Sequence, residues 1–119
     1  STFAGNPLGA AAGLATLDVI EDENLVANAE ARGEQLRDGI MATGNPLFVS
    51  VRGRGLLDAV ELKHPCSHAV MNYCLEHGLI VNAVAPNALR FAPPLIVTAQ
   101  DVDQALAILK DVPTDLPDD

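Results

Sequence analysis

The sequence of 119 residues is long enough for one domain with a single hydrophobic core and too short for two such domains. Apolar residues make up 49% of it, so we expect the chain to fold, and aromatic residues make up only 3%, so the core must consist of Ala, Val, Leu and Ile. The formal charge of -9 and the scattering of seven basic residues argue against a nucleic-acid partner.

The first predicted element is a helix from Leu8 to about Ile20, with Asn6 as its N-cap and Pro7 in its first turn. This helix is apolar on nearly every side, so we expect a neighbouring domain or subunit to cover it. Gly9 and Gly13, four residues apart, would let another backbone approach closely. The apolar run from Pro7 is shorter than the roughly 20 residues that a bilayer span needs, which argues against a membrane segment.

A second helix is predicted after an acidic turn at 21–23. Its apolar residues recur at helical spacing at Leu25, Ala29, Leu36 and Ile40, and Gly44-Asn45-Pro46 ends it. Two antiparallel strands follow, Phe48–Val51 and Leu56–Leu62, and we interpret the intervening Arg52-Gly53-Arg54-Gly55 as the turn between them.

The second half of the chain is predicted to contain two helices and two strands. The elements in chain order are a helix Ser67–Glu76 closed by His77-Gly78, a strand Leu79–Asn82, a turn at Pro86-Asn87, a strand Ala88–Phe91, and a helix capped by Thr98 that buries Val102, Ala105, Leu106 and Leu109. We expect the acidic residues Pro113–Asp119 to be a frayed tail. Helices and strands do not alternate as in a parallel sheet. The predicted class is therefore α+β, a small antiparallel sheet with helices packed on one face.

Imidazole and thiol groups are concentrated between residues 64 and 77, which raises the question of a metal site. The residues are His64, Cys66, His68, Cys74 and His77. Their spacing matches no closed zinc-ligand pattern, and side chains two apart on a helix diverge. We therefore interpret them as capping and packing residues and predict no metal site. The number and spacing of the cysteines also argue against a disulfide framework.

Arg90 is the strongest candidate for a binding residue. It lies on the short predicted strand Leu89-Arg90-Phe91, which two prolines, Pro93 and Pro94, terminate. A guanidinium offers a planar fork of donors that matches a carboxylate in two parallel hydrogen bonds, and lysine lacks that fork. An arginine on a surface strand can also be merely solvated. The residues alone leave both interpretations open.

Three segments together resemble the C-terminal part of the class III pyridoxal-phosphate aminotransferases: Ser1-Thr2-Phe3-Ala4-Gly5-Asn6-Pro7, Val51-Arg52-Gly53-Arg54-Gly55-Leu56-Leu57 and the segment from Leu89 to Leu95. The resemblance implies the C-terminal domain of fold type I enzymes. It assigns Arg90 to the α-carboxylate of amino-acid and 2-oxo-acid substrates. It assigns Thr2, assisted by Ser1, to the phosphate of pyridoxal 5′-phosphate in the other subunit of a homodimer. Asp58 departs from the resemblance, because a small or apolar residue is expected there.

Pyridoxal-phosphate chemistry needs a lysine that carries the cofactor, and neither Lys63 nor Lys110 has the context that the family implies. We therefore expect a fragment of a longer cytoplasmic enzyme, inactive alone, with no catalytic residue of its own. Residues 1–22 would be an interface helix, 23–112 the small domain and 113–119 an acidic tail. A cofactor-free amino-acid-binding regulatory domain and a dimerisation domain without a ligand remain as alternatives.

Overall fold

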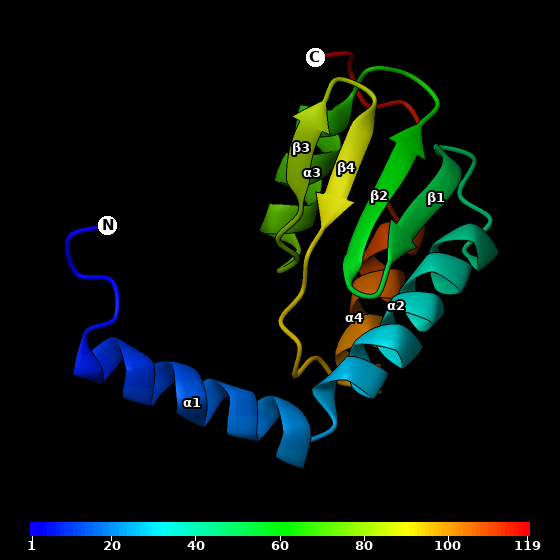
Figure 1. The fold of residues 1–119 in the computed structure, drawn as a ribbon. Helices are drawn as coiled ribbons and strands as arrows, with labels where there is room; N and C mark the ends of the chain where they lie inside the picture. The colour runs from blue at the N-terminus through cyan, green and yellow to red at the C-terminus, as the bar shows by residue number, and fades with distance from the viewer.

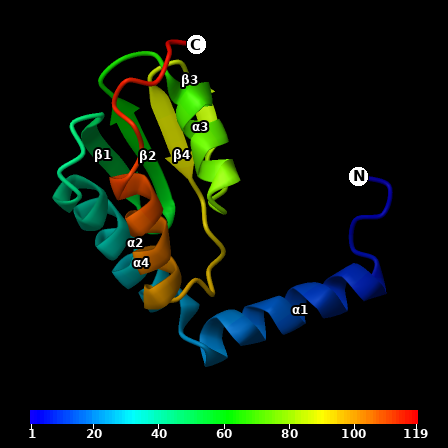
Figure 2. The same cartoon turned by 180° about the vertical axis from the view of Figure 1, so that it is seen from behind.

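The computed structural model describes residues 1–119 and contains four helices and four strands. All strand pairs are antiparallel, and their order in the sheet is β1-β2-β4-β3. Three helices cover one face of this sheet and leave the other face open (Figures 1 and 2). The predicted α+β class, with a small antiparallel sheet and helices on one face, is confirmed.

The helices largely follow the predicted boundaries. They are α1 (Pro7–Asp22), α2 (Leu25–Ala42), α3 (Ser67–Glu76) and α4 (Ala99–Lys110). The side chain of Asn6 caps α1 by accepting a hydrogen bond of 2.7 Å from the backbone N–H of Gly9. Thr98 caps α4, as the sequence predicts, and the structure shows that it does so in a reciprocal box with Asp101. No helix is long and apolar enough to cross a membrane.

Three of the four predicted strands have different bounds in the structure. The strands are β1 (Phe48–Arg54), β2 (Leu57–Leu62), β3 (Asn82–Ala85) and β4 (Ala88–Phe91). The basic segment after Val51 is paired strand and not a turn: Arg52 lies opposite Ala59 and Arg54 opposite Leu57, and only Gly55, with a φ of +57°, has left-handed turn geometry. The strand predicted at Leu79–Asn82 begins at Asn82, because its pairing with Arg90 starts there.

The core lies between the open sheet and its three helices. Alternate residues of the central strands point into it, among them Val60 and Leu62 of β2 and Leu89 and Phe91 of β4. They meet Leu36 and Ile40 of α2, Val70 and Cys74 of α3, and Val102 and Leu109 of α4. Both cysteines are buried and free. Thirteen of the seventeen buried core residues are Leu, Ile or Val, as expected, but the core also contains Phe48, Phe91, Cys66 and Cys74 and no fully buried alanine.

Helix α1 projects from the rest of the molecule and has no buried residue (Figures 1 and 2). It packs against α2 near their connection. The extents of 52 × 32 × 23 Å and the radius of gyration of 16.8 Å reflect this arm. A compact chain of this length would have a radius of about 13.5 Å.

The acidic tail is docked and not frayed, which corrects the expectation. Asp119 accepts hydrogen bonds from the hydroxyl of Ser67 (2.9 Å) and the backbone N–H of His68 (2.9 Å). Asp118 contacts the ring of His64 at 2.7 Å. Burial opposes the ionised form of Asp119, but the hydrogen bonds from His68 and Ser67 prevail and lower the pKa of its carboxyl group. The tail therefore closes the N-terminal end of α3, whose own Cys66 provides no side-chain cap.

Candidate functional site

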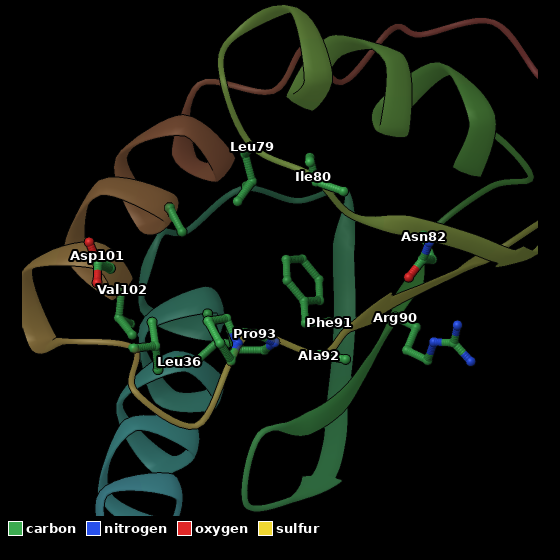
Figure 3. Close-up of a pocket in the computed structure, with 13 residues that line it drawn as sticks. Leu36, Leu79, Ile80, Asn82, Arg90, Phe91, Ala92, Pro93, Asp101 and Val102 are labelled. Atoms are coloured by element: carbon green, nitrogen blue, oxygen red, sulfur yellow. The ribbon is translucent and has the colours of Figure 1, made fainter. Parts of the chain in front are cut away.

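The side chain of Arg90 lies on the open face of the sheet. Its neighbours Leu89 and Phe91 are buried, so the strict alternation of β4 directs Arg90 to the opposite side. Figure 3 shows the guanidinium pointing away from Phe91 and the interior. It forms no hydrogen bond or ion pair with another residue of the chain. The guanidinium is therefore unpaired within this chain, and its role in binding stays a prediction.

The backbone around Arg90 is held from both sides. Strand β4 is central in the sheet, where Arg90 lies opposite Ala59 of β2 and Asn82 of β3. Beyond Pro94, the Asn28 side chain of α2 donates hydrogen bonds to the carbonyl oxygens of Leu95 (2.8 Å) and Val97 (2.9 Å). These contacts tie the proline segment to α2. A pre-positioned guanidinium loses less freedom on binding, which favours affinity.

An apolar cavity of about 340 Å³ lies behind the strand that carries Arg90. Figure 3 shows Leu36, Leu79, Phe91, Pro93 and Val102 around it, with Arg90 at its margin and directed outward. The carboxylate of Asp101, also at the margin, accepts hydrogen bonds from Thr98. The cavity offers packing surface for an apolar group and no nucleophile, so we do not assign chemistry to it.

A buried ion pair lies under the hairpin of β1 and β2, and sequence reasoning missed it. The side chain of Asp58 is fully buried and accepts a hydrogen bond of 2.8 Å from Arg37 of α2, which also donates to the carbonyl oxygen of Gly55 (2.9 Å). Burial raises the pKa of the Asp58 carboxyl group, and Arg37 opposes that rise. Arg37 thus explains how a carboxylate is accommodated where a small or apolar residue was expected, and the pair ties the hairpin to α2.

Ser1 and Thr2 lie at the far end of the α1 arm, exposed and away from the sheet (Figures 1 and 2). The structure does not bring them together with Arg90 within one chain. Their segment is rich in free donors, because the backbone N–H groups of Thr2, Phe3 and Gly5 make no backbone hydrogen bond. No charged side chain precedes Asp18. Hydroxyl and N–H donors without a nearby carboxylate suit an anion such as a phosphate.

The histidines and cysteines are dispersed, and no group of three or more His, Cys, Asp or Glu residues could hold a metal ion. His64 and His68 contact the tail carboxylates of Asp118 and Asp119. Burial raises the pKa of the Cys74 thiol to about 11, and burial also raises the pKa of Cys66. Neither thiol is therefore an activated nucleophile.

Comparison with known proteins gives a consistent result. The family described as Aminotransferase class-III matches residues 1–112. The chain is 44% identical over 120 residues to an acetylornithine aminotransferase of Gloeobacter violaceus, covering 98% of this chain and 30% of that protein. It is 37% identical to an ornithine aminotransferase of Emericella nidulans, covering 98% of this chain and 27% of that protein.

Solved structures agree with the sequence matches. The crystal structure of an acetylornithine aminotransferase from Elizabethkingia anophelis superposes with a TM-score of 0.82 at 38% identity, covering 92% of this chain and 30% of that one. The chain therefore spans less than a third of the length of these relatives. The matched portion contains both the arm and the sheet that carries Arg90.

Proposed function

The chain belongs to the class-III aminotransferases, which depend on pyridoxal 5′-phosphate, and from this membership we propose that it is the C-terminal part of a longer amino-group transferase. We propose that the full-length enzyme transfers the amino group of N2-acetylornithine to 2-oxoglutarate in arginine biosynthesis and acts in the cytoplasm. The similarity to acetylornithine aminotransferases supports this substrate. The isolated chain would be inactive, because neither Lys63 nor Lys110 has a family-like cofactor context.

One observation carries the assignment of a substrate site. Arg90 is an unpaired guanidinium on a central strand, held in place by Asn28 and the proline segment, in a chain that matches the family over residues 1–112. We propose that it binds the carboxylate that the amino donor and the 2-oxo acid share. A bidentate pair fixes both the position and the orientation of the bound acid.

The residues at the start of the chain fit the phosphate of the cofactor. They supply hydroxyl and N–H donors and no negative charge before Asp18. We propose that Thr2, with help from Ser1, binds this phosphate in the partner subunit of a homodimer. When bound, pyridoxal phosphate supplies an electron sink for amino-group transfer. The lysine that carries it would come from outside residues 1–119.

The uncovered α1 helix supports the proposal of a dimer. Leu8, Leu14 and Leu17 are 83%, 64% and 58% exposed, and such an apolar surface marks an interaction site. Light scattering of the full-length protein should give twice the monomer mass. A monomeric mass would remove the basis for placing Thr2 in a partner's site.

Two variants test the role of Arg90 in the full-length enzyme. Arg90→Ala should lower kcat/KM for both the amino donor and the 2-oxo acid by about 10- to 100-fold, the value of a charge-assisted hydrogen bond. Arg90→Lys should recover little, since it lacks the fork. Arg54→Ala, which removes an arginine of β1 that lines a different cavity, is the control. Normal kcat/KM for both substrates in Arg90→Ala would contradict the proposal.

A second amino donor, ornithine, is also considered. The 37% and 43% identities to ornithine aminotransferases of Emericella nidulans and Staphylococcus carnosus favour ornithine as the second candidate. The kcat/KM values for N2-acetylornithine, ornithine, succinylornithine and 4-aminobutyrate will rank the donors. A cofactor-free regulatory domain is disfavoured by the family membership. Borohydride reduction of the full-length protein, followed by peptide mapping, should find a phosphopyridoxyl lysine upstream of Ser1.

A further inference from the structure

The buried pair of Arg37 and Asp58 lies next to the strand that carries Arg90. In the pairing of β2 with β4, Asp58 is opposite Phe91. The next residue of β2, Ala59, is opposite Arg90. The Asp58 side chain points to the helix side of the sheet, where it is fully buried, and the Arg90 side chain points to the open face. The pair therefore supports the sheet from behind at the place where Arg90 projects in front.

One nitrogen of the Arg37 guanidinium holds two points of the hairpin. Nη1 donates to Oδ1 of Asp58 at 2.8 Å and to the carbonyl oxygen of Gly55, in the turn, at 2.9 Å. The turn also lies too close to α2 for a larger residue there, because a Cβ at Gly33 would overlap the same carbonyl group. Through Arg37, α2 therefore fixes both the turn and the start of β2.

The same helix holds the chain that follows Arg90. Asn28, also in α2, donates hydrogen bonds to the carbonyl oxygens of Leu95 and Val97. Arg90 thus lies between β2, which Arg37 anchors, and the proline segment, which Asn28 anchors. Because both anchors belong to one helix, the backbone of Arg90 has fixed neighbours on two sides.

The pair of Arg37 and Asp58 is poorly suited to a role in stability alone. Its carboxylate is fully buried, and Oδ2 of Asp58 has no hydrogen-bond partner. Removing an ion pair from water costs free energy that only complete hydrogen bonding offsets, so apolar residues of similar volume are often equally stable or more stable. A hydrogen-bonded pair does fix an orientation, because its geometry is far more restricted than that of apolar contacts.

We propose that Arg37 and Asp58 are positioning residues for Arg90: through their hydrogen bond they hold its strand where the guanidinium meets the substrate carboxylate. The inference rests on the proposed function, because it takes Arg90 as the residue that binds the carboxylate. A bidentate pair requires strict geometry, so a guanidinium whose strand shifts loses part of the interaction. The loss should appear in KM for both substrates and spare kcat, as for a contact that is equally strong before and during the reaction.

Kinetics of the full-length holoenzyme test this with a replacement that preserves an apolar interior. The double variant Arg37→Met with Asp58→Leu should raise KM for the amino donor and for the 2-oxo acid by about three- to tenfold, with kcat changed less than about twofold. Its melting temperature should stay the same or rise. Asp58→Asn, which keeps an acceptor for Arg37 without the charge, should hold both KM values within about twofold of the parent enzyme.

Two control variants and a single replacement accompany the double variant. Leu109→Ala opens a cavity in the core at the end of α4 and should lower the melting temperature without changing either KM. Ser50→Ala removes the 2.9 Å hydrogen bond to Glu61 elsewhere in the sheet and should also leave both KM values unchanged. If the double variant does not fold, Asp58→Ala, which leaves the 24% exposed Arg37 accessible to water, should raise both KM values instead.

Normal KM values in the double variant, or in Asp58→Ala where that is used, would overturn the positioning role. An equal rise in Leu109→Ala would overturn it too, because KM would then follow the general stability of the fold. A rise in Asp58→Asn as large as in the double variant would exclude the hydrogen bond as the cause. If Arg90→Ala leaves both KM values and kcat unchanged, the carboxylate site itself is refuted, whereas an effect of Arg90→Ala alone refutes only the role of Arg37 and Asp58.

Discussion

The arm (α1, residues 7–22) and the body (residues 25–112) place the same residue types in different environments, solvent in the arm and the core in the body. Leu14 of α1 is 64% exposed, whereas Leu89 of β4 is fully buried. Helix α2 buries Leu25, Leu36 and Ile40, but α1 buries nothing. The contrast teaches that the hydrophobic core lies entirely within residues 25–112, and that α1 contributes no residue to it. A segment of this chain can therefore be helical without being buried.

The largest expected effect comes from shortening a leucine in each region of the 119-residue chain. Leu89→Ala should lower the free energy of unfolding by about 2–5 kcal/mol, because it opens a cavity in the centre of the sheet. Leu14→Ala should change it by less than about 0.5 kcal/mol. Urea unfolding followed by circular dichroism measures both. Similar losses for the two variants would mean that α1 packs on the body in solution.

Two helical glycines, Gly33 in the body and Gly13 in the arm, should respond to alanine with changes in stability of opposite sign. A Cβ at Gly33 of α2 would lie 1.8 Å from the carbonyl oxygen of Gly55, so Gly33→Ala should destabilise the body by about 1–3 kcal/mol. A Cβ at Gly13 meets nothing within 4 Å, and Gly13→Ala should favour the α1 helix by about 0.5–1 kcal/mol. Ellipticity at 222 nm and hydrogen exchange in α1 report the gain. A destabilised body in Gly13→Ala would contradict the picture of a free arm.

A smaller effect is expected at the cap of α4. Thr98→Ala should cost about 1 kcal/mol of stability. Hydrogen bonds from the backbone N–H and the hydroxyl of Thr98 lower the pKa of Asp101 below its ordinary value. A lowered carboxyl pKa stabilises the fold above the unfolded pKa of about 3.9, and that contribution is lost as the pH falls through the folded pKa. Urea titrations from pH 6 to pH 2 should show a shallower acid loss in Thr98→Ala than in the parent chain.

The last test compares the rates at which thiols in the body and in the arm react with a reagent. With a pKa of about 11 for Cys74, only about one thiol in a thousand is ionised at pH 8. Because Cys66 and Cys74 are also buried, both should react slowly with a thiol reagent until denaturant is added. A cysteine introduced by Leu17→Cys on the arm should react within the mixing period. Fast labelling of the parent chain would show that the body opens readily.

Local signals in the sequence predicted most of the helices. Asn6 with Pro7, Thr98, and Gly78 after His77 mark helix ends that the structure retains, because capping depends on neighbouring residues. The hairpin was harder to predict, since two glycines compete for the turn. Gly53 is paired with Asp58 in the strand, and a Cβ there would clash with the carboxylate of Asp58, whereas Gly55 is in the turn and has the positive φ. Only the paired structure distinguishes these two reasons for a glycine.

Part of the site was predictable as well, because strand alternation, like capping, is a local signal. Period-two alternation places Arg90 opposite the buried Leu89 and Phe91, so its exposure follows from the strand itself. Its neighbour Arg52 is 38 positions earlier and becomes a neighbour only through the register of three strands. The partner of Asp58 is Arg37, 21 residues away on α2. Sequence spacing carries no signal for contacts of this kind, and sequence analysis missed both.

The docking of the tail on α3 has a consequence for how the chain is synthesised. The carboxylate of Asp119 binds the backbone N–H of His68, 51 residues earlier, at a helix end that lacks a local side-chain cap. Translation proceeds from the N-terminus, so α3 leaves the ribosome before its cap exists. The N-terminal end of this helix can fray while the helix packs on the sheet, and it is capped only after the tail has emerged. The order of events in this region is therefore set by the geometry of the cap and by the direction of translation together.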